Sequence, residues 1–183
     1  MGTTKWSIDP THSNLGFKIK HLMISHVSGS FKNFQAEVTT SGEDFSTAQI
    51  NLTAEMESII TNNEQRDAHL RNADFFEVEK FPELAFKSTK ITKTGSDTFD
   101  LNGELTLKGI SKPVKLHVEF NGPVKDPWGN ERAGFVISGK INRSEWGINF
   151  NGVLESGGVI LGDEVKIHSE VELVKQAAAS VAS

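Results

Sequence analysis

The residues best suited to chemistry lie in one short stretch, TNNEQRDAHLRNADFFEVEKFP, at 61–82. Arg66 and His69 can donate hydrogen bonds to an anionic or polar group, and arginine offers a planar fork of donors that matches phosphate or carboxylate. Asp67 precedes Arg71 by four residues, the spacing of an ion pair on one helix face. Two interpretations stay open: the group braces a connection between strands, or it contacts a ligand's head group. We favour the brace for Arg66 and Asp67 and ligand contact for His69.

The other chemistry-bearing residues form no catalytic or metal-binding pattern. The six histidines are scattered and lack the H-E-x-x-H spacing of a zinc-binding helix, so no metal site is predicted. The absence of cysteine excludes disulfides, thiolate ligands and a cysteine nucleophile. No G-x-S-x-G elbow, G-x-G-x-x-G or phosphate-binding loop is present, so no cofactor is predicted either. We therefore predict a binding protein rather than an enzyme, with a hydrolase or isomerase of a lipid-like substrate as the alternative.

Length, charge and hydropathy exclude several classes of protein. With 183 residues the chain can bury a sizeable core, and we expect one domain over 1–175 and a disordered tail at 176–183. The formal net charge of -5 argues against a nucleic-acid partner. The sequence contains no run of about 18 apolar residues, so no membrane span is predicted. MGTTKWSIDP lacks the features of a secretory signal, so we expect a cytoplasmic protein as the chain stands, or a periplasmic one if a leader has been removed.

Most of the chain alternates apolar and polar residues. In LGFKIKHL, Leu15, Phe17, Ile19 and His21 alternate with polar positions, and the same period of two recurs in AQINLTAEMES, TFDLNGELTLKG, PVKLHVEF, AGFVISGKI and EVKIHSEVEL. Successive side chains of a strand point to opposite faces, so these segments are half-buried antiparallel strands. The Gly- and Asn-containing breaks between them predict hairpins.

A sheet of this kind must cover its apolar face and its edges, and closing on itself achieves both. We predict an all-β fold: a closed antiparallel up-and-down β-barrel of about eight strands, with one short α-helix crossover near 63–73. An eight-stranded barrel is just wide enough for its own side chains or for one small ligand. Two alternatives therefore remain, a hollow barrel that binds a ligand and a ligand-free structural or interaction barrel.

The apolar face of the strands is the candidate ligand-binding wall. Small residues on it, such as Ala54, Gly103 and Gly139, either leave room for a ligand or adjust the packing. His21 also falls on this face, as a hydrogen-bonded core histidine or as a ligand contact. The candidate lining residues are Phe17, Ile19, His21, Ile50, Leu52, Ala54, Met56, Leu101, Leu105, Leu116, Val118, Phe135, Ile137 and Ile167.

Residues near the predicted helix and the strand ends are candidates for the barrel mouth. Asn62 or Asn63 is a suitable N-cap, and the helix is expected to cross one end of the barrel. Trp128, in the turn DPWGNE, is expected to fold back as a plug. Arg143 faces inward, lies at the rim of the barrel, or forms a surface pair with Glu145 or Glu131. The mouth candidates are Arg66, His69, Phe75, Phe76, Trp128, Arg143 and Trp146.

Five motifs in this order resemble those of the YceI-like family. They are I-D-x-x-H-S, H-x-x-x-S-x-V-x-G-x-F, R-D-x-H-L-R-x-x-x-F-F, G-x-L-T-x-K-G and a late R-x-x-x-G, and the similarity extends from Trp6 to about Val174. The resemblance implies a lipocalin-like extended barrel that binds a long polyisoprenoid or similar amphiphile. It implies no established enzymatic activity. The family includes homodimers, so a homodimer is a possible assembly.

The energetics of an apolar tube agree with this implied role. Burial of a CH₂ group contributes roughly 0.8 kcal/mol to the binding free energy. Ordering of the ligand and the cost of association reduce the net binding free energy to about 0.3 kcal/mol per non-hydrogen atom in large ligands. Tight but unselective binding is therefore expected from the tube, and selectivity from a few polar groups at its mouth. We predict that the protein binds a polyisoprenoid, quinone or related lipid, for carriage, storage or sensing.

Overall fold

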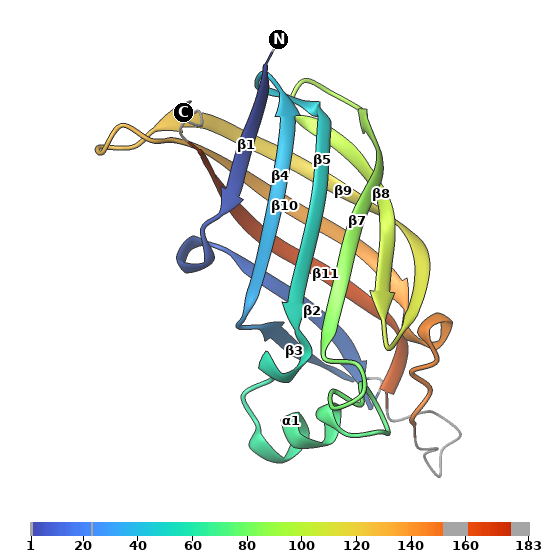
Figure 1. The fold of residues 1–183 in the computed structure, drawn as a ribbon. Coiled ribbons are helices and arrows are strands. Elements are labelled where there is room, and N and C mark those ends of the chain that lie inside the picture. The colour runs from blue at the N-terminus through green and yellow to red at the C-terminus, as the bar shows by residue number, and fades with distance from the viewer. Residues whose placement is uncertain (1, 23, 152–160, 177–183) are drawn as a thin grey trace.

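An antiparallel sheet that curls into a barrel forms the body of the molecule (Figure 1). The computed structural model describes residues 2–22, 24–151 and 161–176. The strands are β1 (Thr3–Ile8), β2 (Asn14–His21), β3 (Ser25–Phe31), β4 (Phe34–Ser41), β5 (Asp44–Glu55), β6 (Ile59–Ile60), β7 (Glu83–Lys93), β8 (Thr98–Leu107), β9 (Ile110–Lys125), β10 (Glu131–Asn142) and β11 (Leu161–Lys175). The helices are α1 (Glu64–Arg71) and the short 3-10 turns η1 (Pro10–His12), η2 (Met56–Ser58) and η3 (Arg143–Trp146).

The sheet closes through β11. This strand pairs with β10 on one side and, on the other, with β1 near one end and β2 near the other. Three of the strand positions around the barrel are each occupied by two shorter strands: β1 with β2, β3 with β4, and β5 with β6. The eleven strands therefore fill eight positions around the barrel. All registered pairs are antiparallel and follow a meander. The prediction of a closed antiparallel barrel of about eight strands with one short helix is confirmed.

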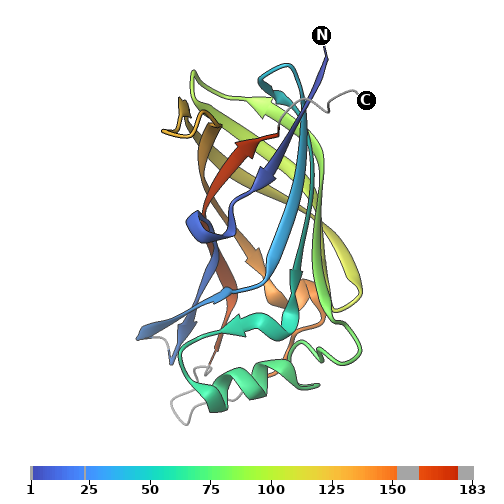
Figure 2. The same ribbon diagram turned by 60° about the vertical axis from the view of Figure 1, so that its left-hand side comes forward.

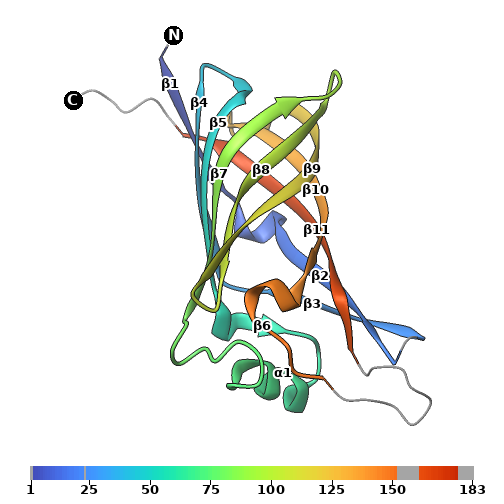
Figure 3. The same cartoon turned by 90° about the vertical axis from the view of Figure 1, so that its right-hand side faces the viewer.

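Aromatic side chains pack inside the barrel at the end away from α1. Phe45 is the second residue of β5, at the strand end opposite the one that leads through η2 and β6 to α1. Its ring lies 4.9 Å from Trp6, 5.3 Å from Phe120 and 5.0 Å from Phe135, measured between centroids. The indole Nε1 of Trp6 donates to Thr40 Oγ1 at 3.1 Å. This cluster therefore lies toward the end of the barrel opposite α1, which crosses the other end (Figures 2 and 3).

Helix α1 is held in place by a buried group around Thr61. Asn63 caps the helix, because its side-chain oxygen accepts from the Arg66 backbone N–H at 3.0 Å. Asp67 is only 6% exposed and accepts from both the backbone N–H and the hydroxyl of Thr61. Arg66 in turn donates from Nε to Thr61 Oγ1 and from Nη2 to the Thr61 carbonyl. The helix is therefore attached to the strand end that precedes it.

The predicted ion pair between Asp67 and Arg71 is wrong. Arg71 instead donates to two backbone carbonyls, from Nε to Glu57 at 3.0 Å and from Nη2 to Ile59 at 3.3 Å. Helical spacing allowed the pair, but Thr61 lies within reach of Asp67 and the open carbonyls of η2 and β6 lie within reach of Arg71. Both charged residues thus connect the helix to neighbouring chain rather than to each other.

An ion-pair group on the outside of the barrel joins three segments. Arg132 on β10 donates to Asp9 at 2.8 Å, to Asp126 at 2.8 Å and to Glu172. The hydrogen bond from Arg132 lowers the pKa of Asp126 to about 2. Hydrogen bonds from Thr11, His12 and Arg132, in that order, hold the pKa of Asp9 well below its usual range. The group ties η1 and the β9–β10 hairpin to β11.

The C-terminal end of the described chain is attached to β1. Gln176, the first residue of the tail expected to be disordered, donates its backbone N–H to the Lys5 carbonyl at 2.8 Å. The rest of that expected tail, 177–183, lies outside the described residues. Within the described residues, no helix is long and apolar enough to cross a bilayer.

Removing the Asp67 carboxylate should destabilise the fold. Asp67→Ala leaves the buried N–H and hydroxyl of Thr61 without their acceptor, so we expect a loss of about 1–3 kcal/mol in the free energy of unfolding, measured by urea denaturation. The control Glu64→Ala changes an exposed acidic residue of the same helix and should stay within about 0.5 kcal/mol. Equal losses in the two variants would contradict the role given to Asp67.

Acid should weaken the Arg132 group. The folded pKa values of Asp9 and Asp126 lie below the unfolded value, so their contribution to stability is present above about pH 4 and is lost as the pH falls toward 2. Arg132→Gln removes a cation from both, so its melting temperature should be lower at pH 7 and should fall less between pH 4 and pH 2 than that of the wild type. In Lys90→Gln, a control at an exposed lysine that has no ion pair within the described residues, the acid dependence should match the wild type; an unaltered profile in Arg132→Gln would refute the assignment.

Candidate functional site

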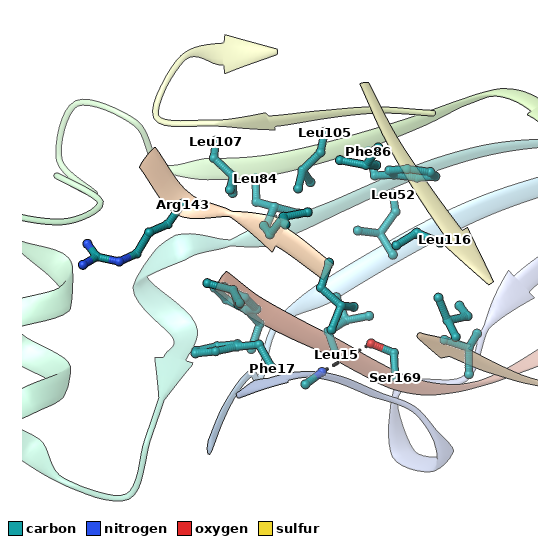
Figure 4. Close-up of a pocket in the computed structure, with 18 of the residues that line it drawn as sticks. Leu15, Phe17, Leu52, Leu84, Phe86, Leu105, Leu107, Leu116, Arg143 and Ser169 are labelled. Carbon is teal, nitrogen blue, oxygen red and sulfur yellow. Dashed lines mark hydrogen bonds between the residues drawn. The ribbon is translucent and has the colours of Figure 1, made fainter. Parts of the chain in front are cut away.

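A cavity of about 530 Å³ occupies the barrel interior. Its wall is almost wholly apolar, and aliphatic and aromatic side chains from the strands converge on it (Figure 4). The volume falls within the roughly 300–1,000 Å³ typical of small-molecule sites. Six side chains of the wall are polar: His21, Thr61, Arg66, His69, Arg143 and Ser169.

The structure brings most of the predicted lining residues together on this wall. The members found there are Phe17, Ile19, His21, Ile50, Leu52, Leu101, Leu105, Leu116, Val118, Phe135, Ile137 and Ile167. Two candidates lie elsewhere. Ala54, the next-to-last residue of β5, and Met56, the first residue of η2, are each 1% exposed and pack with Phe31 and Ile59 in a separate cluster where β5 gives way to η2.

The inward glycines do not enlarge the hollow where they were expected to. A Cβ at Gly103 would collide with the ring of Phe86, and one at Gly139 would meet Leu116 Cδ2 at 2.6 Å. Neighbouring side chains already occupy the space that these glycines leave. The small residues at these two positions therefore adjust the packing of the wall.

Several wall residues were not among the sequence-based candidates. Alternation along β1, β4 and β7 could have identified some of them, since their inward positions have the same period of two. The loop residues and Thr61 carry no such signal, because only tertiary packing brings them to the cavity, whereas Ser169 alternates with Ile167 and Val171 on β11 and could have been identified in the same way. The residues concerned include Ile8, Ala36, Val38, Phe86, Thr61, Ile148, Phe150, Leu161 and Ser169.

Arg143 places a buried cation on the cavity wall. It starts η3, is 6% exposed, and donates from Nε to the Gly162 carbonyl at 3.0 Å and from Nη1 to the Ile148 carbonyl at 2.8 Å. Burial lowers the pKa of its guanidinium, but the guanidinium of arginine stays charged at neutral pH. Within the described residues it has no ion pair, so the predicted surface pair with Glu145 or Glu131 is wrong. The hydroxyl and N–H of Ser144 bind the Asp163 carboxylate.

The α1 segment brings further polar groups to the same wall. Arg66 lines the cavity although two of its donors are committed to Thr61, an arrangement that fits the brace. His69 also lines it, with Nε2 2.9 Å from Asp74 and its ring edge-on to Phe75 and Phe150. Phe75, which is 6% exposed, and Phe76 are both part of the wall, so this end of the cavity combines aromatic and polar surfaces.

The two tryptophans expected at the mouth lie elsewhere. Trp128 is 80% exposed on the projecting β9–β10 hairpin, so the expected plug is wrong. Asp126 accepts from the Trp128 and Asn130 N–H groups and is held by Arg132, which fixes the turn away from the interior. Trp146 is 1% exposed and donates from Nε1 to the Leu105 carbonyl at 2.9 Å. It belongs to the surrounding core rather than to the cavity wall.

One group outside the barrel has ligand atoms suited to a metal. The nearest atoms of Asp9, His12 and Glu172 lie within 4.8 Å of one another. Arg132 already donates to the carboxylates of Asp9 and Glu172, however, and a cation would have to compete with this guanidinium. The geometry therefore supports an ion-pair group at this position.

Comparison with known proteins gives consistent matches over nearly the full chain. A UPF0312 protein of Staphylococcus aureus strain N315 is 42% identical over 170 residues, which cover 92% of this chain and 96% of the relative. The crystal structure of a Campylobacter jejuni YCEI protein is 32% identical, with a TM-score of 0.74 over 87% of this chain and 91% of the other. A polyisoprenoid binding domain from Saccharophagus degradans shares the fold, with a TM-score of 0.64, 15% identity and coverage of 94% and 98%.

The family assignment rests on the extent of these matches. The YceI-like domain matches residues 6–173, which include every strand of the barrel except the first residues of β1 and the last of β11. The sequence resemblance is thereby confirmed. The chain belongs to the YceI-like family.

Proposed function

We propose that the protein binds one long apolar or amphiphilic lipid, of the polyisoprenoid class, inside its barrel. The observation that carries the proposal is the apolar cavity of about 530 Å³, whose polar groups are gathered largely at the α1 end. A chain of repeating hydrocarbon units fits such a wall, because the wall offers dispersion contacts and almost no polar partner along its length. The S. degradans domain of the same fold, a polyisoprenoid binding domain, supports the same class of ligand.

The proposed ligand lies with its head group toward Arg143. Within the described residues this buried guanidinium donates only to carbonyl oxygens and forms no ion pair, although Asp163 attracts it from a longer distance. Buried charges in proteins are usually paired, and an anionic head group would supply a direct counter-charge through charge-assisted hydrogen bonds. Arg66 is less available, since Thr61 takes two of its donors. His69 is proposed as a second head-group contact through its place on the wall.

Filling the cavity should abolish binding. Ile50 on β5 faces the cavity, whereas its neighbour Asn51 is exposed on the outer side of the same strand. Ile50→Trp is expected to weaken the binding of a fluorescent long-chain probe at least tenfold. It should also remove any lipid that co-purifies with the wild type, as measured by native mass spectrometry. Asn51→Trp, the matched control, should keep both. Undiminished binding in a folded Ile50→Trp protein would overturn the proposal, and chemical conversion of the lipid in proportion to protein would favour an enzyme.

The head-group assignment predicts a change in ligand preference. Arg143→Met should lower the affinity for a polyprenyl phosphate by about 10- to 100-fold, since a hydrogen bond to a charged group contributes about 1.5–3 kcal/mol. The neutral polyprenol of the same length should change by less than threefold. Arg66→Met is the control: it should lower the melting temperature and affect both lipids equally. Fluorescence titration measures the affinities, and an equal loss of both lipids in Arg143→Met would show a structural role only.

A further inference from the structure

Three lysines stand directly opposite one another on the outside of the barrel. Lys140 on β10 is in register with Lys166 on β11, which is in register with Lys18 on β2. All three side chains are exposed, and no ion pair involves them within the described residues. Like charges directly opposite each other destabilise a sheet. The row therefore opposes folding slightly, and a binding partner of opposite charge would account for it.

The surroundings of this row keep the local charge positive. A shallow hollow on the outer surface is lined by the three lysines together with Lys115, His117 and His168, and Asp100 is its one acidic member. Asp100 lies 3.4 Å from Lys115, which leaves the row itself unpaired. Lys20 continues the positive charge along β2, and Glu164 is the acidic neighbour along β11. This concentration stands out in a chain whose net charge is -5. On β7, by contrast, Lys87 is in register with Glu104.

The same strand leads from the lysines to exposed apolar side chains. The turn between β2 and β3 carries Leu22, 36% exposed, and Ile24, 84% exposed. Lys18 and Leu22 are separated by about 13 Å along the strand, at roughly 3.3 Å per residue. On the inner side of β2, Ile19 and His21 line the cavity. A single strand thus joins a basic outer surface, an apolar tip and the cavity wall.

We propose that Lys18, Lys20, Lys140 and Lys166, here called the lysine face, dock on the surface of an anionic lipid bilayer. The apolar tip, Leu22 and Ile24, enters the head-group region beside them. This docking would present the α1 end of the cavity to the bilayer in which an apolar ligand resides. The biological purpose of this docking rests on the proposed lipid-binding function, whereas binding of the protein to vesicles can be measured independently of that function.

Charge and apolar surface act together in this kind of attachment. Each lysine near an anionic leaflet strengthens binding by about fivefold, and a few inserted apolar side chains add contact that a soluble polyanion does not offer. A nucleic acid would use the lysines but not the apolar tip, and a second copy of the chain would have to bring a matching acidic surface. The adjoining basic and apolar elements therefore favour a bilayer.

Vesicle flotation tests the docking directly. The probes are vesicles of phosphatidylcholine alone and of phosphatidylcholine mixed with phosphatidylglycerol. We expect the wild type to float only with the anionic vesicles and to be released by high salt, because the attraction is screened. The triple variant Lys18→Glu, Lys140→Glu, Lys166→Glu should bind about 100-fold more weakly or worse, as expected from about fivefold per lysine. Failure of the wild type to float with anionic vesicles at low salt would overturn the proposal.

Two matched controls separate the lysine face from net charge and from general hydrophobicity. Lys5, Lys90 and Lys93 are exposed and are in register with Thr39, Asn102 and Phe99; their triple change to Glu should reduce vesicle binding less than threefold. Ile24→Ser should weaken binding at least threefold, whereas Val124→Ser, at a site 63% exposed on the β9–β10 hairpin, should not. Equal losses in test and control variants would refute the assignment, as would a stable dimer that only the lysine-face triple variant disrupts.

A titration without vesicles distinguishes this proposal from the proposed function. The lysine-face variant should bind the fluorescent long-chain probe in solution with wild-type affinity, since the cavity wall is unchanged. Loss of vesicle binding with retained probe affinity supports docking as a separate property of the outer surface. If the wild type takes up no probe but still floats with anionic vesicles, ligand binding fails and docking stands.

Discussion

β11 pairs with β10 along one edge and with both β1 and β2 along the other, and these ladders turn an open sheet into a ring. Closure removes the exposed strand edges and forces every second side chain toward a common axis. The inward positions are mostly branched aliphatic and phenylalanine side chains, so the ring acquires an apolar interior. Because these side chains do not fill it, a cavity of about 530 Å³ remains. The cavity wall, the helix crossover and the buried cation all depend on this closed arrangement.

The two ends of the interior differ in composition. Trp6, Phe45, Phe120 and Phe135 pack together at one end, with neighbouring ring centroids 4.9–5.3 Å apart in tilted or edge-on arrangements. At the other end the wall strands break into short turns, and backbone carbonyls there accept hydrogen bonds from arginine side chains. Arg71 serves only to attach the helix, whereas Arg143 lines the cavity. A ligand with an apolar chain and a polar head would match this difference between the two ends in one orientation only, with its head at the end that carries Arg143.

Charge on the outer surface is also ordered along the barrel. The Arg132 group lies toward the β9–β10 hairpin, and one guanidinium there pairs with three carboxylates. Farther along β10 and β11, Lys140 and Lys166 face each other beside Lys18 of β2, and no ion pair in the described part of the chain compensates them. The first arrangement stabilises the connection between η1, the hairpin and β11. The second weakens the sheet slightly, and the proposed contact with an anionic bilayer gives a physical reason for its presence.

The sequence by itself determined the all-β class, the closure, the position of the single helix and most inward residues, because a period of two and an N-cap are local properties. It did not determine the partners of Asp67, Arg71 and Arg143, since i,i+4 spacing and neighbouring acids suggested ion pairs that more distant backbone and hydroxyl groups replaced. It also placed Ala54 and Met56 on the wall, although the turn at η2 moves them into a second cluster. Whether the barrel was hollow was decided only in three dimensions, because cavity volume depends on how side chains from different strands interlock.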